Sequence, residues 1–259
     1  MNQTLEVIDK RKSLRAYADR PLSQEEKDII LNAAFRAPTA GNLMLYAILE
    51  IEDQALKDRL VETCDNQPFI ATAPYILVFL ADYQRWLDVY RYAGVAERCQ
   101  DLGRTPRQPG EGDLLLACCD ALIAAQNAVI AAESIGIGSC YIGDILENYE
   151  IHRQVFSLPQ YAVPVAMLCF GHPAQEDDAA PPHTRFFQDY IVHKNAYRRL
   201  SEDQLDAMMA PLDERFANSS NAGGEAQNSA QFTYFRKFIA EFSIEMNRSV
   251  REMIKSWIG

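Results

Sequence analysis

Residues 113–135, DLLLACCDALIAAQNAVIAAESI, form the stretch that decides how this chain folds. The stretch is too long for a strand and apolar on nearly every side, so it predicts a helix buried in a core or in a subunit interface. Asp120, Gln126 and Asn127 are its polar interruptions. A membrane span is the alternative, but each of these polar side chains would be expensive in lipid. The stretch therefore predicts a core helix and no membrane partner.

Three short apolar runs predict buried strands: Tyr46–Ile51 (YAILEI), Tyr75–Leu80 (YILVFL) and Val163–Phe170 (VPVAMLCF). Breakers or polar residues bound each run, as is typical of strands in a sheet covered on both faces. A further strand is expected within 134–144, SIGIGSCYIGD, whose three glycines would let a ligand approach the backbone closely. These glycines follow a helix, whereas the dinucleotide-binding fingerprint follows a strand, so a Rossmann enzyme is disfavoured.

Helix signals lie toward both ends of the chain. Ser23 and Glu26 form a capping box that predicts a helix over about 23–36. Residues 231–259 predict one amphipathic helix, because apolar residues recur there at spacings of three and four: Phe232, Phe235, Phe238, Ile239, Phe242 and Met246. Loops are expected where Pro, Gly or small polar residues gather: 103–112, 171–182 and 218–229.

The composition narrows the range of partners. Lys and Arg total 25 against 36 Asp and Glu, and the net charge of −11 would repel a nucleic acid.

The first residues lack the features of a signal peptide, so a cytoplasmic location is expected. Six cysteines form no CxxC pair and four histidines form no HExxH motif, which predicts buried reduced thiols and no metal.

A cluster of basic residues follows the first few residues. Lys10, Arg11, Lys12 and Arg15 place four cations around the hydroxyl of Ser13, an environment suited to a phosphate. The alternative is a solvated helix end whose cations complement the helix dipole.

A second candidate binding segment is Ala37–Asn42, APTAGN, which directly follows the first capped helix. Pro38 would stop that helix, and Thr39 and Asn42 could offer hydrogen bonds to a flat polar ligand. The alternative is an ordinary helix-terminating loop.

Four segments, taken in order, resemble the nitroreductase family of FMN enzymes. They are RKSLR, APTAGN, GIGSCYIGD after a long apolar helix, and CFGHPA before an arginine. The similarity runs over nearly the whole chain, and HKNAYRRL with the C-terminal segment resembles the larger NADPH-preferring flavin and nitro reductases. The resemblance implies an α+β fold of three α/β/α layers, with a central, mostly antiparallel sheet and a long buried interface helix. It implies one domain over 1–259, with 183–259 as a helical extension.

The resemblance also implies a site for non-covalent FMN. Arg11 would pair with the phosphate, Ser13 would hydrogen-bond the phosphate–ribityl end, and Arg15 would reach the pyrimidine side of the ring. A guanidinium there would stabilise the negative charge that a reduced flavin carries near N1 and O2. The implied site comprises Arg11, Lys12, Ser13, Arg15, Pro38, Thr39, Asn42, Gln67, Tyr141, Ile142, Gly143, His183 and Arg185.

By the same resemblance, Gln67 would meet the flavin edge, and a backbone N–H of 142–143 would approach flavin N5. Part of the loop with Pro38, Thr39 and Asn42 would reach FMN across a dimer interface, which implies a homodimer.

This chain also departs from the family pattern. His183 stands where many relatives have lysine, before the late phosphate-binding Arg185, and Leu43-Met44 replaces Gln-Pro after Asn42. Acceptor preference is expected to differ accordingly.

The implied reaction is hydride transfer from NAD(P)H through flavin N5 to nitroaromatics, quinones or free flavins, with ping-pong kinetics. Such chemistry needs positioning more than a nucleophile, which suits a sequence without a triad. Variable loops around 83–112 and 218–229 would select the acceptor. The alternatives are a dehalogenase or enoyl-type reductase of the same fold, a flavin-binding protein without useful turnover, and an interaction protein without a cofactor.

Overall fold

The computed structural model describes residues 2–174, 185–222 and 224–259. Contacts divide the chain into two compact units, one of Met1–Pro182 with Glu245–Gly259 and one of His183–Ile244. One domain with an extension over 183–259 stays a prediction, and the contacts assign Glu245–Gly259 to the first unit. The two units are described separately.

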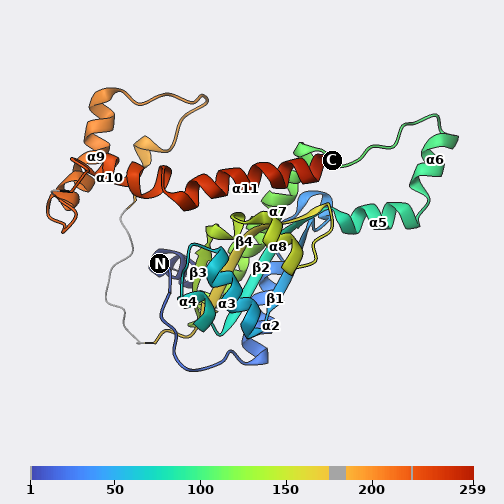
Figure 1. Cartoon of the computed structure of the whole chain (residues 1–259), viewed down its shortest axis with the longest axis horizontal. Coiled ribbons are helices and arrows are strands. Elements are labelled where there is room, and N and C mark those ends of the chain that lie inside the picture. The colour runs from blue at the N-terminus through green and yellow to red at the C-terminus, as the bar shows by residue number, and fades with distance from the viewer. Residues whose placement is uncertain (1, 175–184, 223) are drawn as a thin grey trace. The chain divides into compact units, whose positions relative to one another are not determined.

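The first unit is built on a four-stranded sheet in the order β1-β2-β4-β3 (Figure 1). Its strands are β1 (Tyr46–Ile51), β2 (Tyr75–Asp82), β3 (Gly138–Ile142) and β4 (Ala162–Gly171). All three pairings are antiparallel, with Tyr46 opposite Ala81, Tyr75 opposite Phe170 and Cys140 opposite Cys169. The three predicted apolar runs are strands, and the strand expected within 134–144 is Gly138–Ile142.

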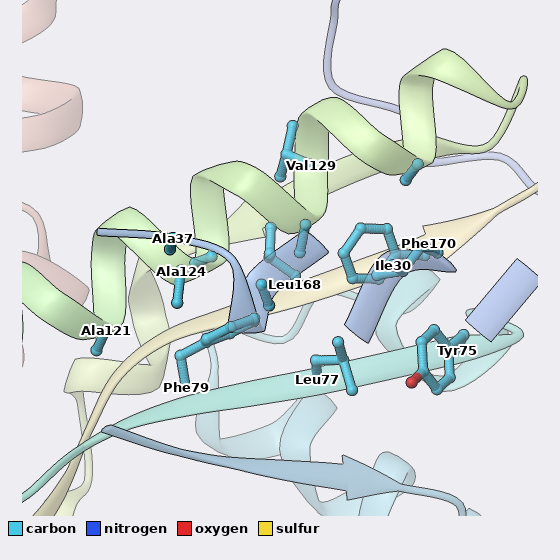
Figure 2. Packing of buried hydrophobic residues seen from close by; sticks show 14 of the residues in the cluster. Ile30, Ala37, Tyr75, Leu77, Phe79, Ala121, Ala124, Val129, Leu168 and Phe170 are labelled. Atoms are coloured by element: carbon cyan, nitrogen blue, oxygen red, sulfur yellow. The ribbon is translucent and has the colours of Figure 1, made fainter. Parts of the chain in front are cut away.

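One face of the sheet packs against α2 (Gln24–Phe35) and α7 (Glu111–Ser134). Tyr75, Leu77 and Phe79 of β2 point toward this layer (Figure 2). The Ser23–Glu26 capping box begins α2 as expected, with each partner's side chain bonded to the other's backbone N–H.

The intervening residues of β2 cover the opposite face, because side chains alternate along a strand. Ile76, Val78 and Leu80 pack with residues of α3 (Gln54–Thr63) and α4 (Phe69–Thr72). Helices therefore cover both faces, and the predicted three-layer α/β/α arrangement is confirmed.

The long apolar helix α7 is a core helix of this unit. Its length and composition alone would allow it to cross a membrane. It lies against the sheet instead, and each polar interruption has a partner. Asn127 donates to the carbonyl of Ala33 at 3.1 Å, and Gln126 accepts from the hydroxyl of Tyr141 at 3.4 Å. The buried face consists mainly of alanines, which let the helix approach the strands closely: Ala117, Ala121, Ala124, Ala125, Ala128 and Ala132.

Several further elements complete the first unit. They are α1 (Gln3–Lys10), η1 (Ala40–Asn42), α5 (Gln84–Tyr92), α6 (Val95–Asp101), η2 (Gly143–Leu146) and α8 (Tyr149–Val155). α11 (Glu241–Ile258) brings the C-terminus back to this core. Trp257 is fully buried, meets the ring of Tyr161 edge-on at 5.4 Å, and donates to the carbonyl of Gly110.

The second unit contains η3 (Gln188–Tyr190), α9 (Glu202–Ala217), α10 (Ser229–Thr233) and a π-helical turn, η4 (Tyr234–Phe238). The prediction of one continuous helix over 231–259 is therefore wrong. The chain bends at 239–240 before α11 begins. Periodicity identifies an apolar face but does not ensure continuity, and Phe238 remains 71% exposed.

Two other expectations need correction. The segment 83–112 is not one loop, because α5 and α6 occupy most of it. The six free cysteines are not all buried: Cys64, Cys140 and Cys169 are, whereas Cys119 is exposed.

The chain after α1 runs beside β3, and one glycine permits this approach. Ser13 forms a parallel bridge with Ser139, and the N–H of Leu14 donates to the Ser139 carbonyl at 2.9 Å. A Cβ on Gly138 would lie 2.6 Å from Cδ2 of Leu14 and 2.8 Å from its Cβ. Such distances are too short for non-bonded carbons, so glycine is required there.

The Gly138→Ala variant is expected to lose about 1–3 kcal/mol of unfolding free energy, because Leu14 must move to admit the methyl group. Gly112→Ala is the matched control, since a Cβ there would meet no atom within 4 Å and the residue sits in the first turn of α7. The control should be neutral or slightly stabilising. Urea unfolding measures both, and equal midpoints for the two variants would contradict the steric explanation.

Candidate functional site

The basic segment 11–15 lies along the edge strand β3. The bridge between Ser13 and Ser139 fixes the segment, and the Oγ of Ser139 is hydrogen-bonded to Glu133 of α7 at 3.1 Å. Burial raises the pKa of Tyr141 to about 12, and the nearby positive charge of Arg11 opposes that shift. The structure thus places Arg11, Lys12 and Ser13 beside the strand that carries Tyr141 and Ile142.

Gln67 and Asp144 form another part of the region beside β3. The amide of Gln67 donates to Oδ2 of Asp144 at 2.7 Å and to the carbonyl of Cys64 at 3.1 Å. The guanidinium of Arg15 lies 5.8 Å from the centroid of the Phe69 ring. Three segments that are distant in sequence, 11–15, 67–69 and 138–144, therefore converge. We call this region the β3-edge site.

The donors of the β3-edge site fit an anionic, planar cofactor. Among the described residues, neither Arg11 nor Arg15 has a carboxylate within salt-bridge distance. Ser13, Arg15 and Gly143 are exposed, and a Cβ on Gly143 would meet no atom within 4 Å. Guanidinium and hydroxyl groups suit a phosphate, and the open backbone at Gly143 can accept a ring edge. This donor set matches what FMN requires.

The loop with Pro38, Thr39 and Asn42 is held by Asp120 of α7. The Asp120 carboxylate accepts from the Thr39 hydroxyl, from the N–H of Ala40 at 3.1 Å and from the N–H of Leu45 at 3.2 Å. Asp120 is 3% exposed. In the sequence it stood out only as an acid in an apolar helix, and this was the available signal for its role.

The loop and the β3-edge site lie at different places along α7. Asp120 binds the loop, whereas Glu133 binds β3 through Ser139. Thirteen residues of helix separate the two contacts by about 20 Å. The structure therefore does not bring Pro38, Thr39 and Asn42 together with Arg11 and Ser13 within one chain.

Leu43 and Met44, which replace the family's Gln-Pro, have a backbone conformation and contacts that explain part of this difference. Met44 has a φ of +51°, which proline cannot adopt. Trp86 of α5 donates to the carbonyl of Leu43 at 2.8 Å, and Arg85 donates to the carbonyls of Met44 and Tyr46. The start of α5 and the Asp120 carboxylate thus hold the loop from two sides.

Of the two late residues of the predicted site, His183 lies outside the described residues. Arg185 belongs to the second unit, where it lines a cavity of about 280 Å³ with Phe187, Tyr190 and Arg215. A larger cavity in the first unit, about 760 Å³, lies between α5, α6 and the chain before α7, and Leu87, Tyr90 and Tyr161 contribute to its lining.

Comparisons with known proteins agree with this architecture. The Nitroreductase family model matches residues 8–172. The oxygen-insensitive NADPH nitroreductase of Salmonella typhimurium is 32% identical, with 84% of this chain and 82% of that protein covered. The FMN reductase [NAD(P)H] of Bacillus subtilis is 30% identical, with 89% of each covered. The solved structure of B. megaterium NfrA2 has a TM-score of 0.78 and 27% identity, covering 99% of this chain and 98% of its own.

The Asp120→Asn variant is expected to loosen the loop at 37–46. An asparagine would direct amide hydrogens toward groups that donate to the carboxylate, at a cost of about 1–3 kcal/mol. Hydrogen–deuterium exchange in 37–46 should accelerate, and the urea midpoint should fall. Asp101→Asn, at an exposed residue, is the control. Unchanged exchange in 37–46 would show that Asp120 does not hold the loop.

Proposed function

This chain belongs to the nitroreductase family, and on that premise we propose that it is an oxidoreductase that binds FMN and takes electrons from NAD(P)H. The observation that supports this most is the convergence of Arg11, Ser13 and Arg15 with Gln67 and Gly143 at the β3-edge site. The resemblance to the family led us to expect each of these residues at the cofactor.

The residues of the β3-edge site would divide the work of holding the cofactor. Arg11 and Ser13 would bind the phosphate, and Arg15 would lie at the pyrimidine end. Bound FMN would supply hydride transfer at N5, which no side chain can perform. Arg15 would favour the reduced state, because a fixed guanidinium stabilises negative charge without reorganisation. Gln67 would orient the ring edge.

We infer that nitroaromatics, quinones or free flavins accept the electrons after the nicotinamide has left, which gives ping-pong kinetics. Relatives named NADPH nitroreductase and FMN reductase support this range. A cytoplasmic location belongs to the same proposal.

The proposal includes a homodimer. The side of α7 away from the sheet exposes a run of apolar residues: Leu115, Leu116, Leu122 and Ile123. Leu115 is 68% exposed, which is costly for a side chain in water and favours burial against another subunit. Within one chain, the α7 residues that bind the loop with Thr39 and the strand β3 lie about 20 Å apart along the helix. A second chain would therefore supply the loop for each site.

The Arg15→Ala variant should still bind FMN but be reduced by NADPH about 10²-fold more slowly, because one charge-stabilising group is lost. Anaerobic stopped-flow absorbance of the bound flavin measures this rate, with Arg20→Ala at an exposed position as the control. Equal rates in the variant and the wild type would refute the role of Arg15. A wild-type protein that binds no FMN would refute the proposed function itself.

The Leu122→Lys variant should shift the protein to a monomer, because a charge at the centre of the apolar run would be buried without a partner. Light scattering after size-exclusion chromatography measures the mass. FMN affinity should fall at the same time if the site uses two chains. Val155→Lys, on α8, is the control at a comparably exposed apolar position. A Leu122→Lys dimer with normal FMN affinity would contradict the proposed interface.

A further inference from the structure

We propose that Glu147 and Asp144 form a proton relay at the β3-edge site, which supplies the proton that an acceptor needs after it has received a hydride. This inference rests on the proposed function, because the relay serves the reduction of an acceptor. Neither carboxyl group belongs to the predicted cofactor site, and the holding of the cofactor uses neither.

The two carboxyl groups are brought together by the turn η2. The N–H of Glu147 donates to the carbonyl of Asp144 at 3.0 Å, which folds the chain back on itself. The Asp144 carboxylate acts on the Glu147 carboxyl and contributes to raising its pKa. Two neighbouring carboxylates repel each other, so a proton on Glu147 is favoured.

Glu147 is the interior member of the pair. It is 5% exposed, and no described group donates to its Oε1. A buried carboxylate without donors is strongly disfavoured, whereas a protonated carboxyl is tolerated. The proton therefore resides mainly on Glu147.

Asp144 is the outer member. It directly follows Gly143 and is partly exposed. Gln67 donates to its Oδ2 at 2.7 Å, which holds the carboxylate at the same edge where an acceptor would lie. The pair thus runs from the interior to the site.

The surrounding charges keep the proton on Glu147 at neutral pH. Burial raises the pKa of Glu147 to about 8, and the carboxylates of Asp144, Asp65 and Glu245 contribute to that rise by repulsion. These groups come from three elements, since Asp65 follows α3 and Glu245 lies on α11. His152 of α8 also packs nearby, but burial lowers its pKa to about 4, so it stays neutral above that pH.

The proposed step balances in atoms and charge. Hydride delivery adds two electrons and one hydrogen to the acceptor and leaves it with one negative charge. An O–H bond of the carboxyl pair then breaks, and a new O–H bond forms on the acceptor. Asp144 passes the proton outward and Glu147 replaces it. The pair is left with one additional negative charge until a proton from solvent restores it.

The test uses the FMN-loaded protein and the Glu147→Gln variant, with Glu62→Gln at an exposed position of α3 as the control. The bound flavin is reduced with dithionite and reoxidised by a soluble quinone between pH 6 and pH 9. In the wild type and the control, the rate should fall above about pH 8, as Glu147 loses its proton. The variant should reoxidise about 10²-fold more slowly at pH 7 and show no such fall.

A second readout does not depend on turnover. The infrared C=O band of a protonated carboxyl should disappear with a midpoint near pH 8 in the wild type and be missing from Glu147→Gln. Because folding raises this pKa, the wild type should lose unfolding free energy relative to the variant as the pH rises from about 4.5 to about 8.

The outcomes separate the relay from the proposed function. An unchanged rate and pH profile in Glu147→Gln would overturn the relay, and so would the absence of the titrating band from the wild type. Flavin that neither NADPH nor NADH reduces would refute the proposed electron donor, whereas the dithionite-reduced protein would still test the relay.

Discussion

The close packing of α7 on the sheet is the constraint on which the rest of the structure depends. Its alanine face allows the helix to lie near β2 and β4, so that Phe79, Leu168 and Phe170 fill the space between them (Figure 2). The same helix carries Asp120 and Glu133, which hold the two halves of the candidate site. A rigid helix therefore sets both the core and the distance between the site's halves.

That distance is the reason for proposing that a second chain completes the site. Asp120 holds the Thr39 loop in place, and the start of α5 holds it from the other side through Trp86. The loop could not move to the β3 edge without breaking the hydrogen bonds to Asp120 and Trp86. A site completed by a second subunit removes the need for such movement and gives the exposed apolar run of α7 a partner surface.

The β3 edge also combines two opposite electrostatic environments. Arg11 and Arg15 present cations to the proposed cofactor, whereas Asp144, Glu147 and Asp65 form a carboxyl cluster at the turn η2. In the proposed function, the cations would stabilise the reduced, anionic cofactor, and the carboxyl cluster would retain a proton for the acceptor. These two demands belong to the same reduction, because both electrons and protons must reach the acceptor.

The sequence by itself predicted the strands at 46–51, 75–80 and 163–170, the capped helix α2 and the core helix α7, and the structure extends the second strand to Asp82 and the third to Ala162–Gly171. Local periodicity and caps encode these elements, because each depends on neighbouring side chains. Through the likeness to a family, the sequence also predicted that RKSLR, Gln67 and the 141–143 stretch are parts of one site. It did not reveal the bend at 239–240 or the helices α5 and α6.

Only the tertiary structure decided which residues distant in sequence become neighbours, such as Asp120 beside Thr39 and Gln67 beside Asp144. The buried surroundings of Glu147 come from α3, η2 and α11, which meet only after folding. A carboxyl group's affinity for a proton depends on those neighbours and on burial, and neither can be read from the residues beside it in sequence.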